Sequence, residues 1–65
     1  MIVLNGRSID QGDVRNIDSL IKIHHIGAAA IVVEKNGVIL NKEQWADIPV
    51  EDGDHIEIIR FVGGG

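Results

Sequence analysis

The residues of this 65-residue chain that could take part in chemistry are concentrated at its C-terminus, where Gly63, Gly64 and Gly65 directly follow an apolar segment. Glycine has no Cβ, so a glycine run can enter a slot that is too narrow for other residues. At about 3.3–3.6 Å per extended residue, the segment from Phe61 to Gly65 could reach on the order of 15 Å from the fold. We expect the carboxylate of Gly65 to be the reactive group, and the alternative is an inert end or linker.

Other catalytic arrangements have little support in the sequence. His24 and His25 are neighbours rather than an i, i+4 pair, and His55 lies at a turn, so we expect no metal site. Ser8 falls in a hairpin and Ser19 early in a helix, neither of which is a nucleophile elbow. A phosphate-binding loop needs several glycines between a strand and a helix, whereas the glycine run here ends the sequence with no helix after it. A fold this small is also expected to enclose no pocket of the usual ligand size.

The composition is that of a small folded domain. Hydrophobic residues make up 45% of the chain, charged residues 25%, and cysteine is absent, so packing alone must hold the core together. No apolar run approaches the roughly 20 residues that span a bilayer, and the start lacks the basic flank of a signal peptide. These features predict a cytoplasmic protein with no membrane partner.

The negative charge is concentrated in the C-terminal part of the chain. Residues 1–40 hold four acidic and four basic residues, whereas residues 41–65 hold six acidic and two basic residues, which accounts for the net charge of −4. A solvated acidic face is one explanation. The other is a docking surface for a basic partner protein, and the same charge disfavours nucleic acid as a partner.

Two Asn-Gly pairs, at 5–6 and 36–37, predict type I′ hairpin turns, because both residues of such a turn need positive φ angles. The apolar run 28–33 is typical of an interior strand. The segment 52–54, Asp-Gly-Asp, predicts a turn into the last strand. The strands expected are therefore 2–4, 7–9, 28–33, 38–40 and a last strand that begins at His55.

The main helix is expected to begin after Asn16, its N-cap, and to end near His25, with Gly27 as the C-terminal stop. Its apolar stripe consists of Ile17, Leu20 and Ile21, with His24 at the far end. A further single helical turn over 42–45 should be capped by Asn41. Trp45 and Phe61 are the whole aromatic content, and such rings are more often core anchors than ligand platforms.

The last strand should present two different faces. Ile56 and Ile58 point one way, and the other face carries His55, Glu57, Ile59 and Phe61. Because a single helix can cover only one face of a sheet, the second face must meet water or a partner. We expect Ile59, Phe61 and Val62 to form a docking patch beside the glycine tail, unless a bulge returns Ile59 or Phe61 to the core.

Taken together, these segments resemble the ThiS family of sulfur carriers in thiamine biosynthesis. The matching residues are Leu4-Asn5-Gly6, Ile17 to Ile21, Ala30 to Val33 with Asn36-Gly37, Gln44-Trp45, Asp52-Gly53-Asp54, Ile56-Glu57-Ile58, and Phe61-Val62 before the glycines. The terminal Gly-Gly of that family maps to Gly64 and Gly65, and Gly63 is an additional glycine. The resemblance implies a ubiquitin-like β-grasp domain of the α+β class over residues 1–62 and a flexible tail over 63–65. The implied sheet order is second, first, last, third and short strand, with the main helix on one face.

The resemblance also implies a mechanism. An E1-like, ThiF-type adenylyltransferase would adenylate Gly65 with ATP, and sulfur from a persulfide donor would replace AMP to leave a thiocarboxylate. A ThiG-type thiazole synthase would then take that sulfur, while Gly63 and Gly64 thread the partners' active sites. The chain itself would catalyse nothing and would bind no cofactor, since the activating partner uses the ATP. Three alternatives remain at this point: a carrier for molybdopterin synthase, a ubiquitin-like protein modifier, and an interaction module whose tail is inert.

Overall fold

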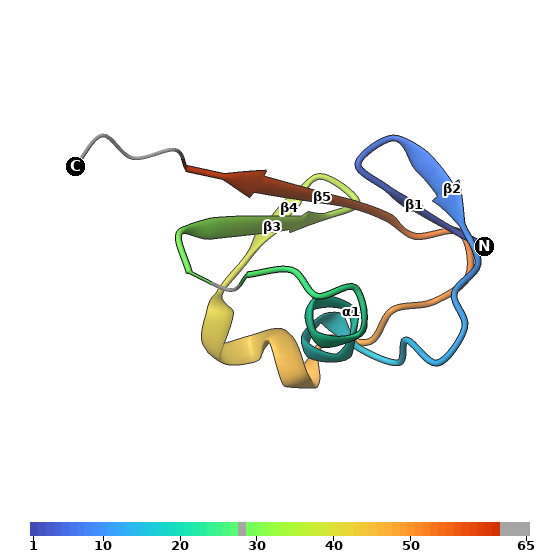
Figure 1. The fold of residues 1–65 in the computed structure, drawn as a ribbon, viewed down its shortest axis with the longest axis horizontal. Coiled ribbons are helices and arrows are strands. Elements are labelled where there is room, and N and C mark those ends of the chain that lie inside the picture. Colours follow the sequence, from blue (N-terminus) through green and yellow to red (C-terminus); the bar gives the residue numbers. More distant parts are fainter. Residues whose placement is uncertain (28, 62–65) are drawn as a thin grey trace.

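The structure, a computed structural model, describes residues 1–27 and 29–61. Figure 1 shows a sheet with helix α1 packed beneath one of its faces. In chain order the elements are β1 (Ile2–Leu4), β2 (Arg7–Ile9), α1 (Ile17–Ile23), β3 (Ile31–Lys35), β4 (Val38–Leu40), the 3-10 helix η1 (Lys42–Asp47) and β5 (His55–Arg60).

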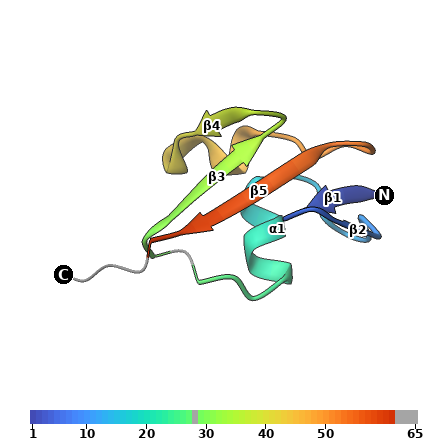
Figure 2. The same ribbon diagram turned by 90° about the horizontal axis from the view of Figure 1, so that it is seen from above.

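The strands form a five-stranded mixed sheet in the order β2-β1-β5-β3-β4, which is the order predicted (Figure 2). The last strand, β5, lies at the centre, parallel to β1 and antiparallel to β3. The outer strands β2 and β4 pair antiparallel with β1 and β3. The predicted α+β class is therefore confirmed, and the C-terminal segment leaves from the middle of the sheet.

Both predicted hairpin turns are present. Asn5 and Gly6 have φ angles of 50° and 81°, and Asn36 and Gly37 have φ angles of 50° and 85°. Positive φ at both central residues is the mark of a type I′ turn, whose twist matches that of the strands it joins. The first turn joins β1 to β2 and the second joins β3 to β4, so each hairpin supplies one neighbour of β5.

The asparagine side chains of these turns also bind β5. Asn5 Oδ1 accepts a hydrogen bond of 2.7 Å from the backbone N–H of Ile58, and Asn36 Oδ1 accepts one of 2.9 Å from the N–H of His55. Strand β1 ends at Leu4, so Asn5 continues the hydrogen-bonding ladder beyond the end of that strand. The central strand is thus held from both sides by side chains as well as by backbone groups.

Helix α1 begins as predicted but ends earlier. Asn16 Oδ1 accepts a hydrogen bond from Ser19 N–H, and Ser19 Oγ accepts one from Asn16 N–H, which makes a capping box. The helix ends at Ile23, and His25 rather than Gly27 adopts the left-handed conformation, with φ of 55°. His25 and Ile26 donate backbone hydrogen bonds to the carbonyls of Lys22 and Ile21. This is the Schellman pattern, so the stop predicted at Gly27 is wrong by two residues.

Two further predictions on local structure need correction. Strand β3 begins at Ile31 rather than at residue 28, because Ala30 has a φ of 56° and cannot continue a strand; Ala28 lies outside the described residues. The predicted single turn over 42–45 is a six-residue 3-10 helix, and the Asn41 side chain makes no capping hydrogen bond among the described residues. Both errors concern connections whose conformation depends on tertiary packing.

The core lies between α1 and the inner face of the sheet. Its buried apolar residues are Ile2, Val14, Ile17, Leu20, Ile21, Val33, Trp45, Val50 and Ile56. Trp45 is only 4% exposed, so its role as a core anchor is confirmed. Full burial of each such side chain contributes about 1.5–3 kcal/mol. This packing sets the spacing between helix and sheet.

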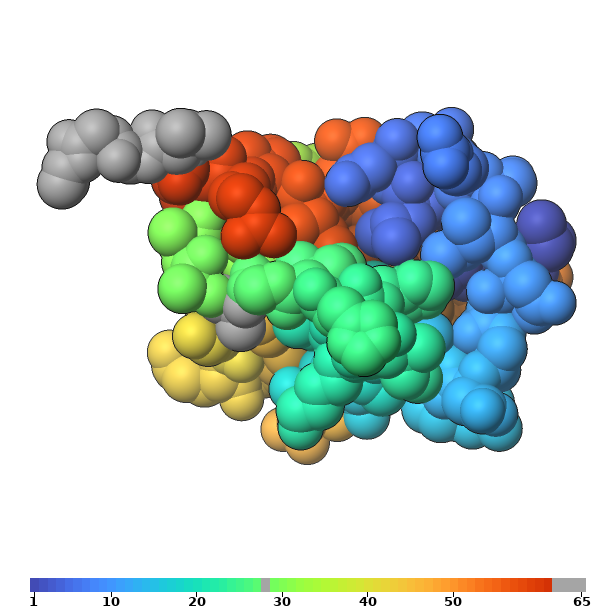
Figure 3. Space-filling model, in the orientation of Figure 1, coloured from blue at the N-terminus to red at the C-terminus, as the bar shows by residue number. Residues whose placement is uncertain are grey.

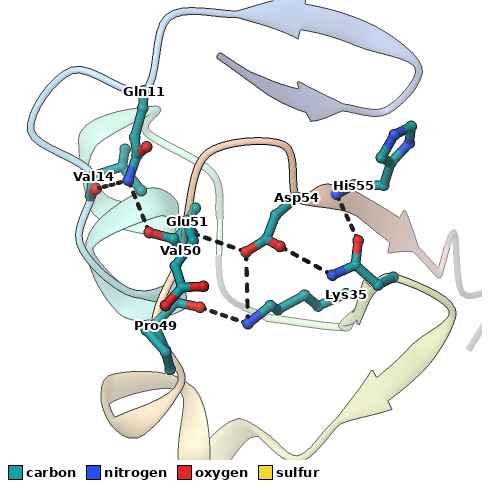
Figure 4. A network of polar contacts seen from close by, with 9 residues as sticks. Gln11, Val14, Lys35, Pro49, Val50, Glu51, Asp54 and His55 are labelled. Atoms are coloured by element: carbon teal, nitrogen blue, oxygen red, sulfur yellow. Dashed lines mark hydrogen bonds and ion pairs between the residues drawn. The ribbon is translucent and has the colours of Figure 1, made fainter.

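A polar network fixes the beginning of β5 (Figure 4). The Asp54 carboxylate accepts hydrogen bonds from Glu51 N–H at 2.8 Å and Asn36 Nδ2 at 3.0 Å, and Lys35 Nζ lies 3.6 Å away. Lys35 also donates to the carbonyl of Pro49. Burial raises the pKa of Asp54, but these donors and the Lys35 charge outweigh it, so its pKa is lowered.

The lowered pKa of Asp54 predicts an acid-sensitive fold. The pKa of Asp54 in the folded protein lies below its ordinary value of 3.8. The ionised carboxylate therefore stabilises the fold at pH values above 3.8, and this stabilisation is lost as the pH falls through the folded pKa. The free energy of unfolding should fall less steeply below about pH 4 in Asp54→Asn than in the wild type. Urea titrations at a series of pH values measure this difference. Asp13→Asn is the control, because the Asp13 side chain makes no contact of this kind among the described residues. Identical pH profiles for Asp54→Asn and the wild type would contradict this.

The Asn5 side chain should contribute measurably to stability. Asn5→Ala loses the bond to Ile58 and forces alanine into a left-handed conformation, which should lower the free energy of unfolding by about 2 kcal/mol. Asn5→Gly keeps the favourable φ and loses only the bond, so its cost should be about 1 kcal/mol. Chemical denaturation of both variants separates the two effects. An Asn5→Gly protein as stable as the wild type would show that the hydrogen bond from Ile58 N–H to the Asn5 side chain does not stabilise the domain.

Candidate functional site

The C-terminal end of β5 is the root of the predicted reactive tip. Phe61, the last described residue, donates a backbone hydrogen bond of 2.9 Å to the carbonyl of Ala30, so the chain is attached to its neighbour up to this point. The predictions that concern Val62 and the three glycines lie outside the described residues. Sheet order and this last bond place Phe61 at the end of the central strand.

The outer face of the sheet, opposite α1, can be assigned from the strand register. Ile59 pairs with Val32, while Glu34 pairs with both Glu57 and Ile39, and cross-strand partners share a face. Buried Val33 and Ile56 belong to the other face, against the helix. The outer face therefore carries Val32, Ile39 and Ile59, with Phe61 following by alternation.

These four side chains, Val32, Ile39, Ile59 and Phe61, form what we call the outer apolar patch. Ile59 is 42% exposed, Phe61 58% and Ile39 67%. The predicted exposure of Ile59 and Phe61 is confirmed, so neither is returned to the core by a bulge, and the expectation of a core role for the Phe61 ring is wrong. An exposed apolar group at the root of the tail is typical of an interaction surface.

Two carboxylates lie directly opposite each other beside this patch. Glu34 on β3 and Glu57 on β5 are register partners, and neither forms an ion pair with another described residue. Like charges at directly opposed positions of a sheet are destabilising. The domain therefore retains an unfavourable pair on its outer face, which a cationic side chain of a partner would neutralise.

The face of the sheet that carries α1 has a hollow of about 520 Å³ between α1, the loop after it and η1. Figure 3 shows the green end of α1 and its following loop beside the yellow η1 segment. The expectation that this fold is too small for a pocket of ligand size needs correction, because such pockets measure roughly 300–1,000 Å³. This hollow lies on the opposite side of the sheet from the outer apolar patch.

The part of the chain that the structure describes shows neither a metal site nor a membrane-spanning helix. Among residues 1–27 and 29–61, no group of three or more His, Cys, Asp or Glu side chains is arranged to hold a metal ion. His24 is the exposed C-cap of α1, which agrees with its prediction as a helix-end histidine. Within the same residues, none of the helices has the length and apolar character needed to cross a membrane.

The mixed sheet with β5 at its centre, and α1 packed across one face, define a ubiquitin-like β-grasp domain. In this architecture the last strand, β5, lies in the middle of the sheet, and this strand order defines the class of protein. Comparison with known proteins identifies the family within that class.

The ThiS family model matches residues 2–65. The sulfur carrier protein ThiS of Bacillus subtilis (strain 168) is 35% identical over the full length of both chains. The crystal structure of the thiamine biosynthesis protein ThiS from Geobacter metallireducens superposes with a TM-score of 0.82 at 33% identity, covering 98% of this chain and 97% of that one. A thiazole synthase of Paramagnetospirillum magneticum is 31% identical over 98% of this chain, which corresponds to 20% of that protein.

The chain belongs to the ThiS family. Its function is that of a sulfur carrier in thiamine biosynthesis, and it is not an enzyme, as the sequence predicted.

The features that the sequence did not reveal are the facing carboxylates and the hollow. Periodicity placed Glu57 on the outer face, but the opposition of Glu34 requires the register of β3 against β5.

Removing one of the facing carboxylates should stabilise the domain. Glu34→Gln keeps the size of the side chain and abolishes the repulsion, so the free energy of unfolding should rise by about 0.2–1 kcal/mol at low salt. The gain should shrink at high salt, because exposed charges are screened. Glu51→Gln is the control, since Glu51 is exposed and has no facing carboxylate in the strand register. A Glu34→Gln protein less stable than the wild type would refute the repulsion.

Proposed function

We propose that this chain carries sulfur as a thiocarboxylate on Gly65 and delivers it with its body docked through the outer apolar patch. The observation that carries the proposal is the position of Phe61. It is hydrogen-bonded to the sheet, exposed beside Ile59, and followed by Val62 and the three glycines. A partner that grips the patch therefore has the terminal carboxylate within a reach of a few extended residues.

The chemistry requires activation, because a carboxylate is a poor electrophile. In the proposed sequence, a ThiF-type enzyme transfers the AMP moiety of ATP to the Gly65 carboxylate and releases pyrophosphate. The terminal sulfur of a persulfide donor then attacks the carbonyl carbon, and AMP leaves. A thiol reduces the resulting S–S bond, which yields the thiocarboxylate and a disulfide. The chain contains no cysteine, so no side-chain thiol competes with the terminus as the sulfur-bearing group.

The proposed recipient is a ThiG-type thiazole synthase. Support comes from the Paramagnetospirillum thiazole synthase, in which a segment similar to almost the whole of this chain makes up a fifth of the protein. Joining a carrier-like segment to a synthase is consistent with direct contact between the two. Gly63 and Gly64 are proposed to thread the active sites of both partners, since a residue without Cβ fits a narrow channel.

The charges of the outer face define what the docking partner must present. Glu34 and Glu57 face each other on the sheet and lie beside Ile59, so an arginine flanked by apolar side chains would neutralise the pair and cover the patch. Electrostatic complementarity of this kind accelerates association and excludes acidic partners. The proposed partner surface is therefore basic, in agreement with the charge distribution along the sequence.

Sulfur loading can be read from the intact mass of the chain. Incubation with a ThiF-type enzyme, ATP, a persulfide donor and a thiol should add the mass difference between sulfur and oxygen. The same incubation without ATP is the control, and deletion of Gly65 should abolish the change. An unchanged mass of the full chain under conditions that load a known sulfur carrier would reject the proposal, as would loading of the chain that lacks Gly65.

Docking through the outer apolar patch can be tested separately from the chemistry. Ile59→Asp should raise the chain concentration needed for half-maximal ATP–pyrophosphate exchange by about tenfold or more, because it places a charge in the patch. Val38→Asp is the matched control: Val38 is 62% exposed but shares the helix-side face with Lys35. Equal effects of the two substitutions would rule out a specific role for the patch.

A further inference from the structure

The hollow between α1 and η1 has the make-up of a small-molecule site. Its apolar floor consists of Ile21, Ile26 and Trp45, and Ile21 and Trp45 are each only 4% exposed. Its rim is polar and carries Lys22, Lys42, His25 and Asp18. An apolar floor with a few convergent polar groups is the usual composition of a ligand pocket.

The charge of this rim is positive, although the chain as a whole carries −4. The carboxylate of Asp18 is already paired with Lys22 at 2.8 Å. Lys42 has no ion pair among the described residues, and its Nζ lies 6.0 Å from the centroid of the Trp45 ring. Arg60 adds a further cation, because its Nη1 would lie 3.4 Å from a Cβ placed on Gly27, another residue of the lining.

The indole of Trp45 has one hydrogen bond left to make. Its Nε1 is buried and has no acceptor among the described residues. Buried N–H groups without a partner are rare in folded proteins, and each one calls for an explanation. Because less than 1 Å² of this atom is accessible, a ligand in the hollow would contact other atoms of the indole, and the N–H signal reports on binding from beside the site.

We propose that this hollow binds a small aromatic anion, a carboxylate or phosphate carried on a flat ring. The ring lies against the apolar floor that includes Trp45, and the anionic group lies at the rim, where the Lys42 ammonium attracts it and the His25 imidazole N–H donates a hydrogen bond to it. Because the hollow is on the helix side of the sheet, the outer apolar patch remains free while the ligand is bound. The proposal does not depend on sulfur transfer, and its test uses the isolated chain.

The test follows the Trp45 indole signal, which is unique because the chain has a single tryptophan. In an NMR titration of the labelled chain, benzoate and phenyl phosphate should each shift the Nε1–H resonance saturably, and the tighter of the two identifies the preferred anion. Acetate, an anion without a ring, and benzyl alcohol, a ring without a charge, should produce much smaller shifts. Benzyl alcohol acting as strongly as benzoate, or the absence of a saturable shift with both aromatic anions, would overturn the proposal.

Three variants make the test specific. Lys42→Ala should weaken binding of the better probe by at least about fivefold, because it removes a rim charge. His25→Gly should also weaken it, and this variant should fold well since glycine is the preferred residue at the left-handed position that ends a helix. Arg7→Ala, in edge strand β2, removes the same charge outside the lining and should bind as the wild type does. Equal losses in Lys42→Ala and Arg7→Ala would reveal general charge attraction rather than a site.

Discussion

The structure depends on how strand β5 is held. It has a strand on each side, and the side chains of Asn5 and Asn36 add an acceptor from each flank, to Ile58 and His55. Asp54 anchors its beginning through Glu51, Asn36 and Lys35. A strand fixed in this way cannot shift without breaking bonds to both neighbours, so the point from which the C-terminal segment departs is fixed relative to the whole domain.

The sheet built around β5 has two faces with different roles. The inner face is used for stability, because α1 and Trp45 cover it and complete the core. The outer face is left to partners, and it keeps both an apolar patch and the facing Glu34–Glu57 pair, neither of which helps the isolated domain. In the proposed function more than one enzyme recognises the carrier, and this requires such a surface to be free. The local cost in stability is small compared with the contribution of the core.

Much of the fold could be predicted from local rules. The Asn-Gly pairs, the cap at Asn16 and the alternation in β5 act over a few residues, and each prediction was confirmed. The start of β3, the stop at His25 and the form of η1 could not be predicted. Ala30 and His25 adopt left-handed conformations that residues other than glycine rarely take, and the packing of Trp45 depends on contacts between segments far apart in the sequence. The same holds for the site. Ile59 and Phe61 follow from alternation, whereas the Glu34–Glu57 opposition and the hollow require the register and the packing of helix against helix.

Because both neighbouring strands and two asparagine side chains hold β5, it should be the most stable part of the sheet. Native-state hydrogen exchange tests this most directly, because it measures the free energy of opening at single amides. The amides of His55 and Ile58, which bind the two asparagine side chains, should exchange only through global unfolding, with opening free energies equal to that of the whole domain. Exchange of these amides through a local opening of β5, well below the global free energy, would contradict the account.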